Sequence, residues 1–432
     1  MLKKINRGMI QYIRNNSLLR EKLKKIVLPL MVSDMQTNIP EITPLNVRAT
    51  EDAAPRFNIL LPSVNQEHVF GGISTALSFF DQLAQYMPIK KRIITTDVMP
   101  DSKAIEQFKD YDPVDCHQNR ASERQIVGFS DRLGKTIPVG ENDYFLATAW
   151  WTAFHAQKIV RWQQEEYKKP AKKLIYFIQD FEPGFYPWSS RYALSESTYR
   201  FDLPQVAVFN SSMLHTFFKE NRYAFNTEFV FEPVLNEKLK KGLDTVSSPL
   251  NKKKKILVYG RPGVERNAFP LIIEALKAWV WQQPGVHDWA LISAGERHPD
   301  IDLGHGMVLK SVGKLPLEEY IDKLRESAIG ISLMVSPHPS YPPMEMAMFG
   351  MGVITNRYAN KQLSCWHENI QSIDLSVDTL VRALQDKCDR FAIDNQCFLG
   401  GRLLKQQYLE SGVQFDFFKP LVQKVFKGDL DL

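Results

Sequence analysis

Two arginines and a lysine are the residues whose types and positions could hold a diphosphate. Arg261 and Arg266 follow the apolar, strand-like residues 256–259, and Lys314 follows the apolar residues 307–309. A guanidinium fork matches phosphate oxygens and stays charged at physiological pH. We therefore predict that these three cations bind the diphosphate of a nucleotide. The alternatives are surface salt bridges for the arginines and a solvated loop position for Lys314.

One acid, Glu345, stands within the apolar stretch PPMEMAMFG. Burying a carboxylate is unfavourable unless it is paired or hydrogen-bonded. A ribose hydroxyl would supply such a bond, so we predict that Glu345 binds the sugar of the nucleotide; a buried structural ion pair is the alternative. Tyr341, just before this stretch, is included in the predicted nucleotide-sugar site. The backbone of four further residues is predicted to face the base: Val312, Gly313, Lys314 and Leu315.

Two more carboxylates, Asp180 and Glu182, follow the strand-like residues 173–179 in the loop DFEPGFY. They are candidates for orienting an acceptor hydroxyl or for a general base. Pro183 and Gly184 favour a turn, which we expect to display both carboxylates at the site. The alternative is a turn-capping Asp and a solvated Glu. The same loop carries aromatic side chains suited either to stacking on sugar rings or to a core position: Tyr186, Trp188 and Tyr192.

Gly71 and Gly72 lie between a predicted strand and a predicted helix. Glycines there let backbone N–H groups approach a phosphate, although turns use the same pair. The sequence contains no Walker A, HExxH or GxSxG motif, and no GxGxxG after a strand. Asp429 and Asp431 form a DxD at the C-terminal end, which we interpret as a tail. We therefore predict no metal site and no cofactor besides the donor substrate.

Strand-like and helical patterns alternate twice along the chain, before and after a polar stretch at residues 236–254. In the first run, an apolar strand at 58–64 precedes a helical pattern for which Ser74 is a suitable N-cap. In the second, strands at 256–259, 289–294, 329–335 and 353–356 are separated by helical patterns. Such alternation predicts parallel sheets with right-handed crossovers. We expect an α/β protein with two Rossmann-like doubly wound domains facing each other across a cleft.

Four segments follow from these patterns. Residues 1–56 are predicted to form a basic amphipathic helix and a linker, and 57–245 an N-terminal Rossmann-like domain for the acceptor. Residues 246–400 are predicted to form the C-terminal nucleotide-sugar domain, and 401–432 a helical segment that can cross back to the first domain.

Charge is concentrated at the N-terminus of this 432-residue chain. Residues 1–26 carry eight Lys or Arg and one acid, whereas the whole chain has a net charge of +5, so the remainder is slightly acidic. A basic nucleic-acid binder is therefore excluded. The N-terminal segment is predicted to lie on an anionic membrane surface, or alternatively to pack on its own domain. With no signal peptide and four cysteines lacking a CxxC pattern, we expect a cytoplasmic protein at the inner face of the membrane.

From about Phe57 onward, the chain resembles family-4 retaining glycosyltransferases with the GT-B fold. The resemblance rests on the GGI segment at 71–73, on GRPGVERN with Arg261 and Arg266, and on PPMEMAMFG with Glu345. Within this family, YFIQDFEPGFYPWSS and SPHPSYPPMEMAMFG are similar to bacterial rhamnosyltransferases that build surface-layer glycans from dTDP-L-rhamnose. The first glutamate of the family's usual pair is replaced here by Pro337, and a 6-deoxy sugar would suit a pocket without it.

The resemblance implies a role for each candidate. Arg261 and Lys314 would hold the diphosphate, Glu345 the deoxyribose hydroxyl, and the backbone around Gly313 the thymine. The reaction would be retaining, metal-independent transfer of L-rhamnose to a growing glycan on a lipid carrier. Catalytic roles would fall to Arg261 and Lys314 at the leaving group and to Asp180 or Glu182 at the acceptor. A nucleotide-sugar epimerase and a non-catalytic glycan-binding scaffold are the alternatives, and a homodimer is one of the oligomeric states left open.

Overall fold

The computed structural model describes residues 38–68, 71–120, 122–244, 251–409 and 414–426. The chain divides into two units at Thr43 and Pro44. The described part of the first unit contains the short helix η1 (Pro40–Ile42), and the second unit contains both large sheets. The predicted basic helix at residues 1–26 lies outside the described residues. Within the described part of the chain, no helix combines the length and apolar character that a membrane span requires.

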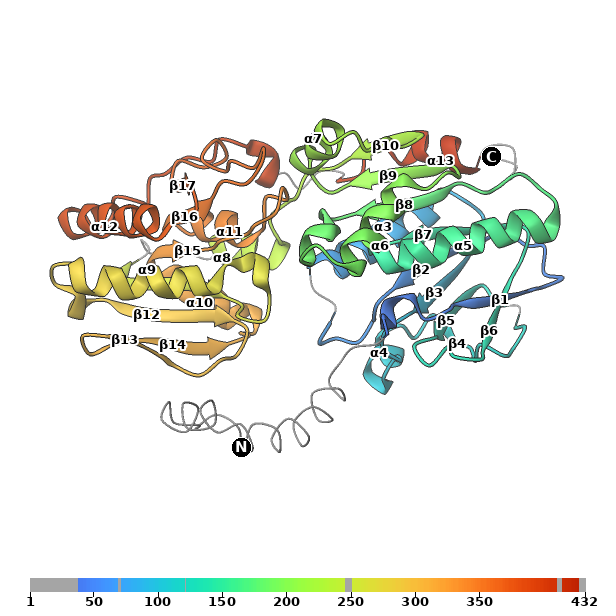
Figure 1. The fold of residues 1–432 in the computed structure, drawn as a ribbon, viewed down its shortest axis with the longest axis horizontal. Helices are drawn as coiled ribbons and strands as arrows, with labels where there is room; N and C mark the ends of the chain where they lie inside the picture. Colours follow the sequence, from blue (N-terminus) through green and yellow to red (C-terminus); the bar gives the residue numbers. More distant parts are fainter. Residues whose placement is uncertain (1–37, 69–70, 121, 245–250, 410–413, 427–432) are drawn as a thin grey trace, which may run out of the picture. The chain divides into compact units, whose positions relative to one another are not determined.

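The first sheet is parallel throughout its described strands, in the order β10-β9-β8-β7-β2-β3-β5-β4 (Figure 1). Its strands are β2 (Arg56–Leu61), β3 (Lys90–Thr95), β4 (Asp112–Pro113), β5 (Arg124–Gly128), β7 (Asp143–Ala147), β8 (Leu174–Ile178), β9 (Gln205–Phe209) and β10 (Thr227–Val230). The helices along this part of the chain are α3 (Gly71–Ala84), α4 (Ser102–Gln107), α5 (Trp150–Tyr167), η2 (Glu182–Phe185), α6 (Ser190–Ser197), η3 (Thr198–Arg200) and α7 (Ser212–Glu220).

The second sheet has the order β13-β14-β12-β11-β15-β16-β17 and is parallel except for its edge strand β13. Its strands are β11 (Lys253–Gly260), β12 (Ala290–Gly295), β13 (Ile301–Gly304), β14 (Met307–Gly313), β15 (Ser327–Ile331), β16 (Gly352–Asn356) and β17 (Ile370–Ile373). The helices along it are α8 (Glu237–Asp244), η4 (Glu265–Asn267), α9 (Phe269–Gln282), η5 (Val286–Asp288), α10 (Leu317–Glu326), α11 (Pro342–Met348), α12 (Val377–Ile393) and η6 (Gln406–Leu409). The prediction of two Rossmann-like α/β domains is therefore confirmed.

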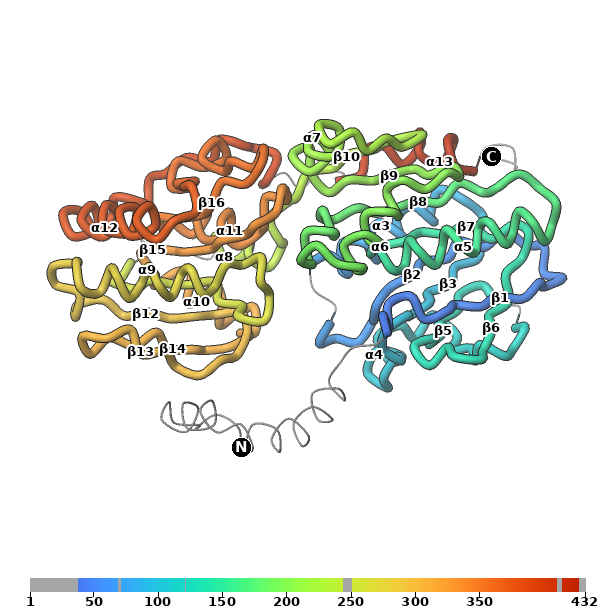
Figure 2. The backbone as a smooth tube through the Cα atoms, viewed as in Figure 1, coloured from blue at the N-terminus to red at the C-terminus, as the bar shows by residue number. Residues whose placement is uncertain are grey.

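Each sheet is covered by helices on both faces because side chains alternate along its central strands. In β2, Ile59 belongs to the core cluster that includes α3, whereas Leu60 belongs to the cluster that includes α5. In β11, Val258 packs with α9 and α12, whereas Leu257 packs with α10 and α11. Helices α9 and α12 run side by side on their sheet (Figure 2). These opposed cores make the strands rigid supports for the loops at their carboxyl ends.

The last described helix, α13 (Phe418–Phe426), packs on the first sheet although it follows the second in sequence (Figure 1). The ring of Phe426 lies 5.8 Å from that of Phe57 and 4.5 Å from that of Tyr144. Phe417 stacks on Phe229 of β10 with 5.0 Å between ring centroids. The C-terminal segment thus completes the core of the first domain.

Two local predictions differ from the structure. Residues 46–49, expected in a linker, form strand β1 (Asn46–Ala49), which pairs with β6 (Thr136–Val139) in a separate parallel ribbon. The described part of helix α3 begins at Gly71, so Ser74 lies inside the helix and is not its N-cap. Ile73 packs on the core, and the Thr75 hydroxyl donates to the Gly71 carbonyl at 2.9 Å. Gly71 and Gly72 are therefore assigned to the helix and not to a loop.

Candidate functional site

The loops after β11 and β15 lie side by side at the point where the strand order of the second sheet reverses. Ligands of open α/β sheets bind at the carboxyl ends of the strands near such a point. The backbone oxygen of Arg266 accepts a hydrogen bond from the N–H of Val335 at 2.7 Å. The Asn267 side-chain amide donates to the Leu333 carbonyl at 2.9 Å. These bonds fix the loop that carries the predicted phosphate-binding arginines.

Arg266 is paired with Asp180, which follows β8 of the first sheet. Its guanidinium donates to Asp180 Oδ2 and lies over the ring of Phe185, 4.1 Å from the centroid. Asp180 Oδ1 accepts a hydrogen bond from the hydroxyl of Ser336. Through these two bonds Asp180 links loops of both sheets. Asp180 is also buried, so it is not displayed to solvent.

A second set of buried polar groups surrounds this pair, and the sequence analysis did not single it out. His338 Nδ1 accepts the N–H of Ser340 at 3.0 Å, and its Nε2 lies 3.1 Å from Asn210 Nδ2. Burial lowers the pKa of His338 to about 4, so the ring is neutral at pH 7. Lys361 donates to the Met334 carbonyl, and burial lowers its pKa to about 7. The clue available in the sequence was the position of His338, soon after the buried strand β15.

Arg261 and Lys314 lie near each other at the ends of β11 and β14. Burial and the nearby charge of Arg261 both lower the pKa of Lys314, whose ammonium donates to the Glu67 carbonyl at 3.1 Å. Arg261 has no acidic partner within ion-pair distance among the described residues. Gly313 (φ +69°) and Gly295 (φ +142°) end their strands in conformations that suit glycine. An anion would relieve the repulsion between these cations.

Glu345 projects from α11, whose first turn contains two prolines, a favoured start for a helix. The Tyr320 hydroxyl donates to Glu345 Oε2 at 3.1 Å, and no described Lys or Arg forms an ion pair with this carboxylate. The alternative of a structural ion pair is therefore not realised among these residues. Burial raises the pKa of Glu345 to about 7. The pKa of Tyr341 is raised to about 12, mainly by burial and to a smaller extent by the charge of Glu345. Val312, Lys314 and Leu315 are at least partly exposed, so this segment is accessible to a ligand.

Glu182 lies elsewhere than the turn pattern suggested. The short helix η2 turns its side chain inward, where Oε2 accepts the backbone N–H of Trp150, the first residue of α5. Burial raises the pKa of Glu182 to about 8, more than the Trp150 N–H lowers it, and the charge of Asp180 raises it further. The carboxyl group is therefore mostly protonated at pH 7. We assign Glu182 a positioning role, because it ties the loop to α5 and is not displayed.

Replacing Glu182 by Gln is expected to remove a pH-dependent loss of stability. Between about pH 4.5 and 8 the unfolded chain releases this proton while the folded chain keeps it, so wild-type stability falls as pH rises. The slope is about 1.4 kcal/mol per pH unit at most. In urea unfolding at pH 5 and 8, Glu182→Gln should gain stability relative to wild type at the higher pH. The exposed Glu166→Gln on α5 is the matched control; equal pH profiles for the two variants would contradict the assignment.

Gly71 and Gly72 are the first described residues of α3. A Cβ on Gly72 would lie 2.5 Å from Gln179 Oε1, so this position has no room for a side chain unless Gln179 moves. Residues 69–70, which precede the helix, are outside the described part of the chain. Phosphate binding by these two amides stays a prediction.

Two other features lie away from these loops. In the described part of the chain, one group has metal-ligand spacing: Asp115, Cys116 and His117, after the edge strand β4. A cavity of about 1100 Å³ lies at the amino ends of β2 and β3, the edge opposite the site, and is lined by Pro55, Lys91 and Arg124 among others. The predicted tail motif at Asp429 and Asp431 lies outside the described residues.

Family models match the chain in the order of its two sheets. The model for "WsaF, N-terminal domain" matches residues 56–212, and that for "WsaF, C-terminal domain" matches residues 254–385. The O-antigen biosynthesis protein RfbC of Myxococcus xanthus is 30% identical over 252 residues. That match covers 58% of this chain but only 18% of RfbC, so the chain spans less than a fifth of this relative.

Solved structures show the same fold at low sequence identity. Anabaena HepE, in complex with UDP and glucose, gives a TM-score of 0.51 at 11% identity, over 86% of this chain and 95% of HepE. The trehalose-6-phosphate synthase OtsA gives a TM-score of 0.52 at 10% identity, over 86% of this chain and 99% of OtsA. WaaG, a glycosyltransferase involved in lipopolysaccharide biosynthesis, gives a TM-score of 0.50 at 12% identity, over 86% of this chain and 100% of WaaG.

Fold and matches together define the chain as a glycosyltransferase of the GT-B class. More particularly, its two halves match the two domains of WsaF in the same order.

Proposed function

We propose that this chain transfers L-rhamnose from dTDP-L-rhamnose to a growing bacterial surface glycan, with retention and without a metal. The observation that carries the proposal is the juxtaposition of Arg261 and Lys314 at the strand ends of the second sheet. The carboxylate of Glu345, which has no cationic partner among the described residues, projects from a helix of the same domain. Cations for a diphosphate and an acceptor for a ribose hydroxyl are the groups that a nucleoside diphosphate sugar requires.

The donor would bind to the second domain. Arg261 and Lys314 would contact the diphosphate, and Glu345, flanked by Tyr341, would accept a hydrogen bond from the deoxyribose hydroxyl. The backbone of Val312, Gly313, Lys314 and Leu315 would face thymine. HepE, which shares the fold, has been solved with UDP and glucose, a ligand pair of the class that we propose.

Catalysis would rest on stabilising the leaving diphosphate. As the glycosidic bond to the phosphate breaks, negative charge grows on the departing oxygen, and cations fixed beside it lower the barrier. Arg266 would join Arg261 if the diphosphate displaced Asp180 from its guanidinium. The departing phosphate oxygen can take the proton of the acceptor hydroxyl, so no separate strong base is required. Asp180 would then be free to orient that hydroxyl.

The acceptor would meet the first domain, and the names of two relatives support a surface glycan as its class. RfbC is named for O-antigen biosynthesis and WaaG for lipopolysaccharide biosynthesis, which both concern surface glycans. A lipid-linked glycan at the inner face of the cell membrane is the acceptor that we propose, with the basic residues 1–26 holding this cytoplasmic protein at the anionic surface.

Calorimetry of the full chain with dTDP-L-rhamnose, UDP-glucose and GDP-mannose tests the donor. We expect dTDP-L-rhamnose to bind about 10-fold tighter or more than the other two, a difference of about 1.4 kcal/mol. Equal or absent binding would refute the donor assignment.

Product analysis separates the alternative functions. Release of dTDP that requires a rhamnan acceptor supports transfer, and conversion of the sugar nucleotide without an acceptor would identify an epimerase. Pro337, where a glutamate of the family is missing, favours the alternative of a non-catalytic scaffold. Glycan binding with no release of dTDP would establish that alternative.

A further inference from the structure

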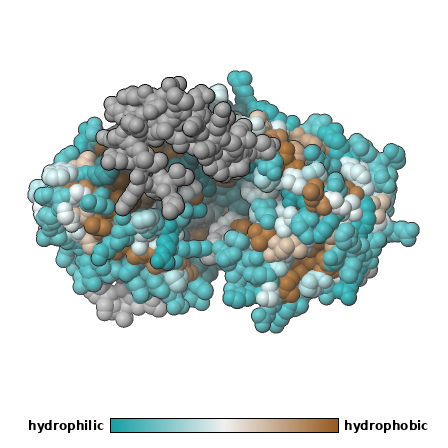
Figure 3. Space-filling model, turned by 60° about the horizontal axis from the view of Figure 1, so that its bottom comes forward, coloured by the Kyte–Doolittle hydropathy of each residue, from teal (hydrophilic) through white to brown (hydrophobic). Residues whose placement is uncertain are grey.

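Exposed Trp188 and partly exposed Tyr192 form an aromatic pair at the start of α6. The indole of Trp188 is 93% exposed, and its ring lies 6.2 Å from that of Tyr192 at 37°. Most of the exposed surface in Figure 3 is hydrophilic, with apolar atoms in separate patches. A single exposed apolar side chain is common on a protein surface, so exposure alone does not mark a site. A rigid aromatic ring beside a second ring does offer the amphipathic surface that Trp and Tyr provide at interfaces.

The exposure of Trp188 does not come from a loosely held loop. The loop is anchored before it by Asp180 on Arg266 and Ser336, and by Glu182 on the α5 N-terminus. Tyr186 accepts a hydrogen bond from the Trp150 indole N–H at 2.9 Å. After it, the Ser189 hydroxyl accepts the N–H of Tyr192 at 3.3 Å and caps α6.

A purely structural role does not explain why an indole stands at this position. A residue just before an N-cap can pack on the first helical turn and fix the entry of the chain. The contact between Trp188 and Tyr192 has this position, but it leaves 93% of Trp188 exposed and so stabilises little by burial. A smaller apolar residue would serve the same local purpose.

The surroundings indicate a neutral, hydroxyl-rich ligand. Residues 183–192 (PGFYPWSSRY) contain one charged residue, Arg191, and three hydroxyl side chains near the indole, on Ser189, Ser190 and Tyr192. Both serines are exposed. An indole face packs against the C–H face of a pyranose while neighbouring hydroxyls bond its polar edge, whereas a phosphate would call for several cations.

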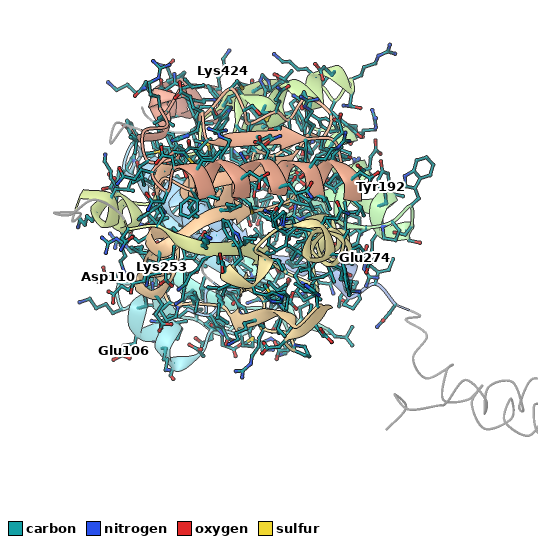
Figure 4. The ribbon with its side chains drawn as sticks, turned by 90° about the vertical axis from the view of Figure 1, so that its left-hand side faces the viewer. Glu106, Asp110, Tyr192, Lys253, Glu274 and Lys424 are labelled. Carbon is teal, nitrogen blue, oxygen red and sulfur yellow. The ribbon has the colours of Figure 1, made fainter. Side chains whose placement is uncertain are left out.

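The loop also connects this surface to the candidate site. Phe185, three residues before Trp188, lies under the Arg266 guanidinium, and Asp180 binds the same arginine. Figure 4 labels Tyr192 at the margin of the molecule, with its side chain drawn outward. A glycan resting on the aromatic pair would therefore extend from the loop that carries the predicted acceptor-orienting carboxylate.

We propose that Trp188 and Tyr192 form a platform for a neutral saccharide ring of the acceptor glycan. This inference rests on the proposed function, because it assigns the acceptor side of the same reaction. It places the platform ring one or more residues away from the sugar that is extended. The platform sets acceptor affinity and has no part in donor binding.

The test compares Trp188→Ala, Trp188→Phe and Trp281→Ala in the full chain. Trp281 on α9 is the matched control, since it is an exposed tryptophan (69%) on the other sheet. The probe is a synthetic tri-L-rhamnoside, with binding followed by saturation-transfer NMR and steady-state transfer measured at saturating dTDP-L-rhamnose. Neither readout depends on indole fluorescence.

We expect Trp188→Ala to raise the acceptor KM about 10-fold with kcat and dTDP affinity nearly unchanged. Trp188→Phe should retain most of the binding, and Trp281→Ala should match wild type. Equal acceptor KM in Trp188→Ala and Trp281→Ala would overturn the platform. If the trisaccharide binds through Trp188 while no nucleotide sugar binds, the platform stands and the proposed transfer reaction fails. If the donor binds and replacing Trp188 changes nothing, the platform fails and the donor site stands.

Discussion

Replacing Arg261 by Ala should lower kcat/KM for dTDP-L-rhamnose by about 10²–10³-fold, the range found when one preorganised charge-stabilising group is removed. Arg261 has no acidic partner among the described residues and lies close enough to Lys314 to lower its pKa. Its removal therefore breaks no ion pair there and should leave stability nearly unchanged. Steady-state kinetics combined with urea unfolding measure the two effects separately.

Two further variants sharpen this test. Arg261→Lys keeps the charge but loses the guanidinium fork, so an intermediate loss is expected. Arg357→Ala, at a half-exposed arginine after β16 that lies 3.6 Å from Asp374, is the matched control and should behave as wild type. Arg266 is a poorer probe, because its removal would leave the buried carboxylate of Asp180 without its cation. Wild-type activity in Arg261→Ala would exclude this arginine from the donor site.

Replacing Glu345 by Gln should weaken dTDP-L-rhamnose binding about 10- to 100-fold at pH 8 and much less at pH 6. A hydrogen bond to a charged group contributes about 1.5–3 kcal/mol, more than one to a neutral amide. Because burial raises the pKa of Glu345 to about 7, the carboxylate is mostly ionised at pH 8 and mostly protonated at pH 6. Wild-type affinity should therefore rise with pH through 7, whereas the variant should show no such rise. Calorimetry at pH 6 and pH 8 measures the affinity of both proteins for dTDP-L-rhamnose.

The donor itself is a suitable probe for this experiment, since its diphosphate is a diester and does not titrate in this range. The exposed Glu318→Gln on α10 is the matched control and should keep the wild-type pH dependence. A pH profile of Glu345→Gln that parallels wild type would show that another group is responsible and would remove Glu345 from the deoxyribose contact.

The positions of the site residues relative to the strands could be predicted from the sequence. The strand expected at 256–259 is part of β11, and the helix expected at 342–348 is α11, so Arg261 and Glu345 stand at a strand end and in a helix as the pattern indicated. Such predictions succeed because the periodicity of buried side chains is a local property, set by neighbours within one element. The class of fold followed from the same alternation.

Only the tertiary structure decided which of these residues meet. Asp180 binds Arg266, 86 residues away, and His338 approaches Asn210, 128 residues away. The inward turn of Glu182 depends on the free N–H at the start of α5, and β1 exists as a strand because β6 pairs with it. No local pattern encodes such pairs, because their free energy is realised only when two distant segments are buried together. The sequence by itself therefore determined the elements and their chemistry, and the packing of the two sheets decided the contacts of each side chain.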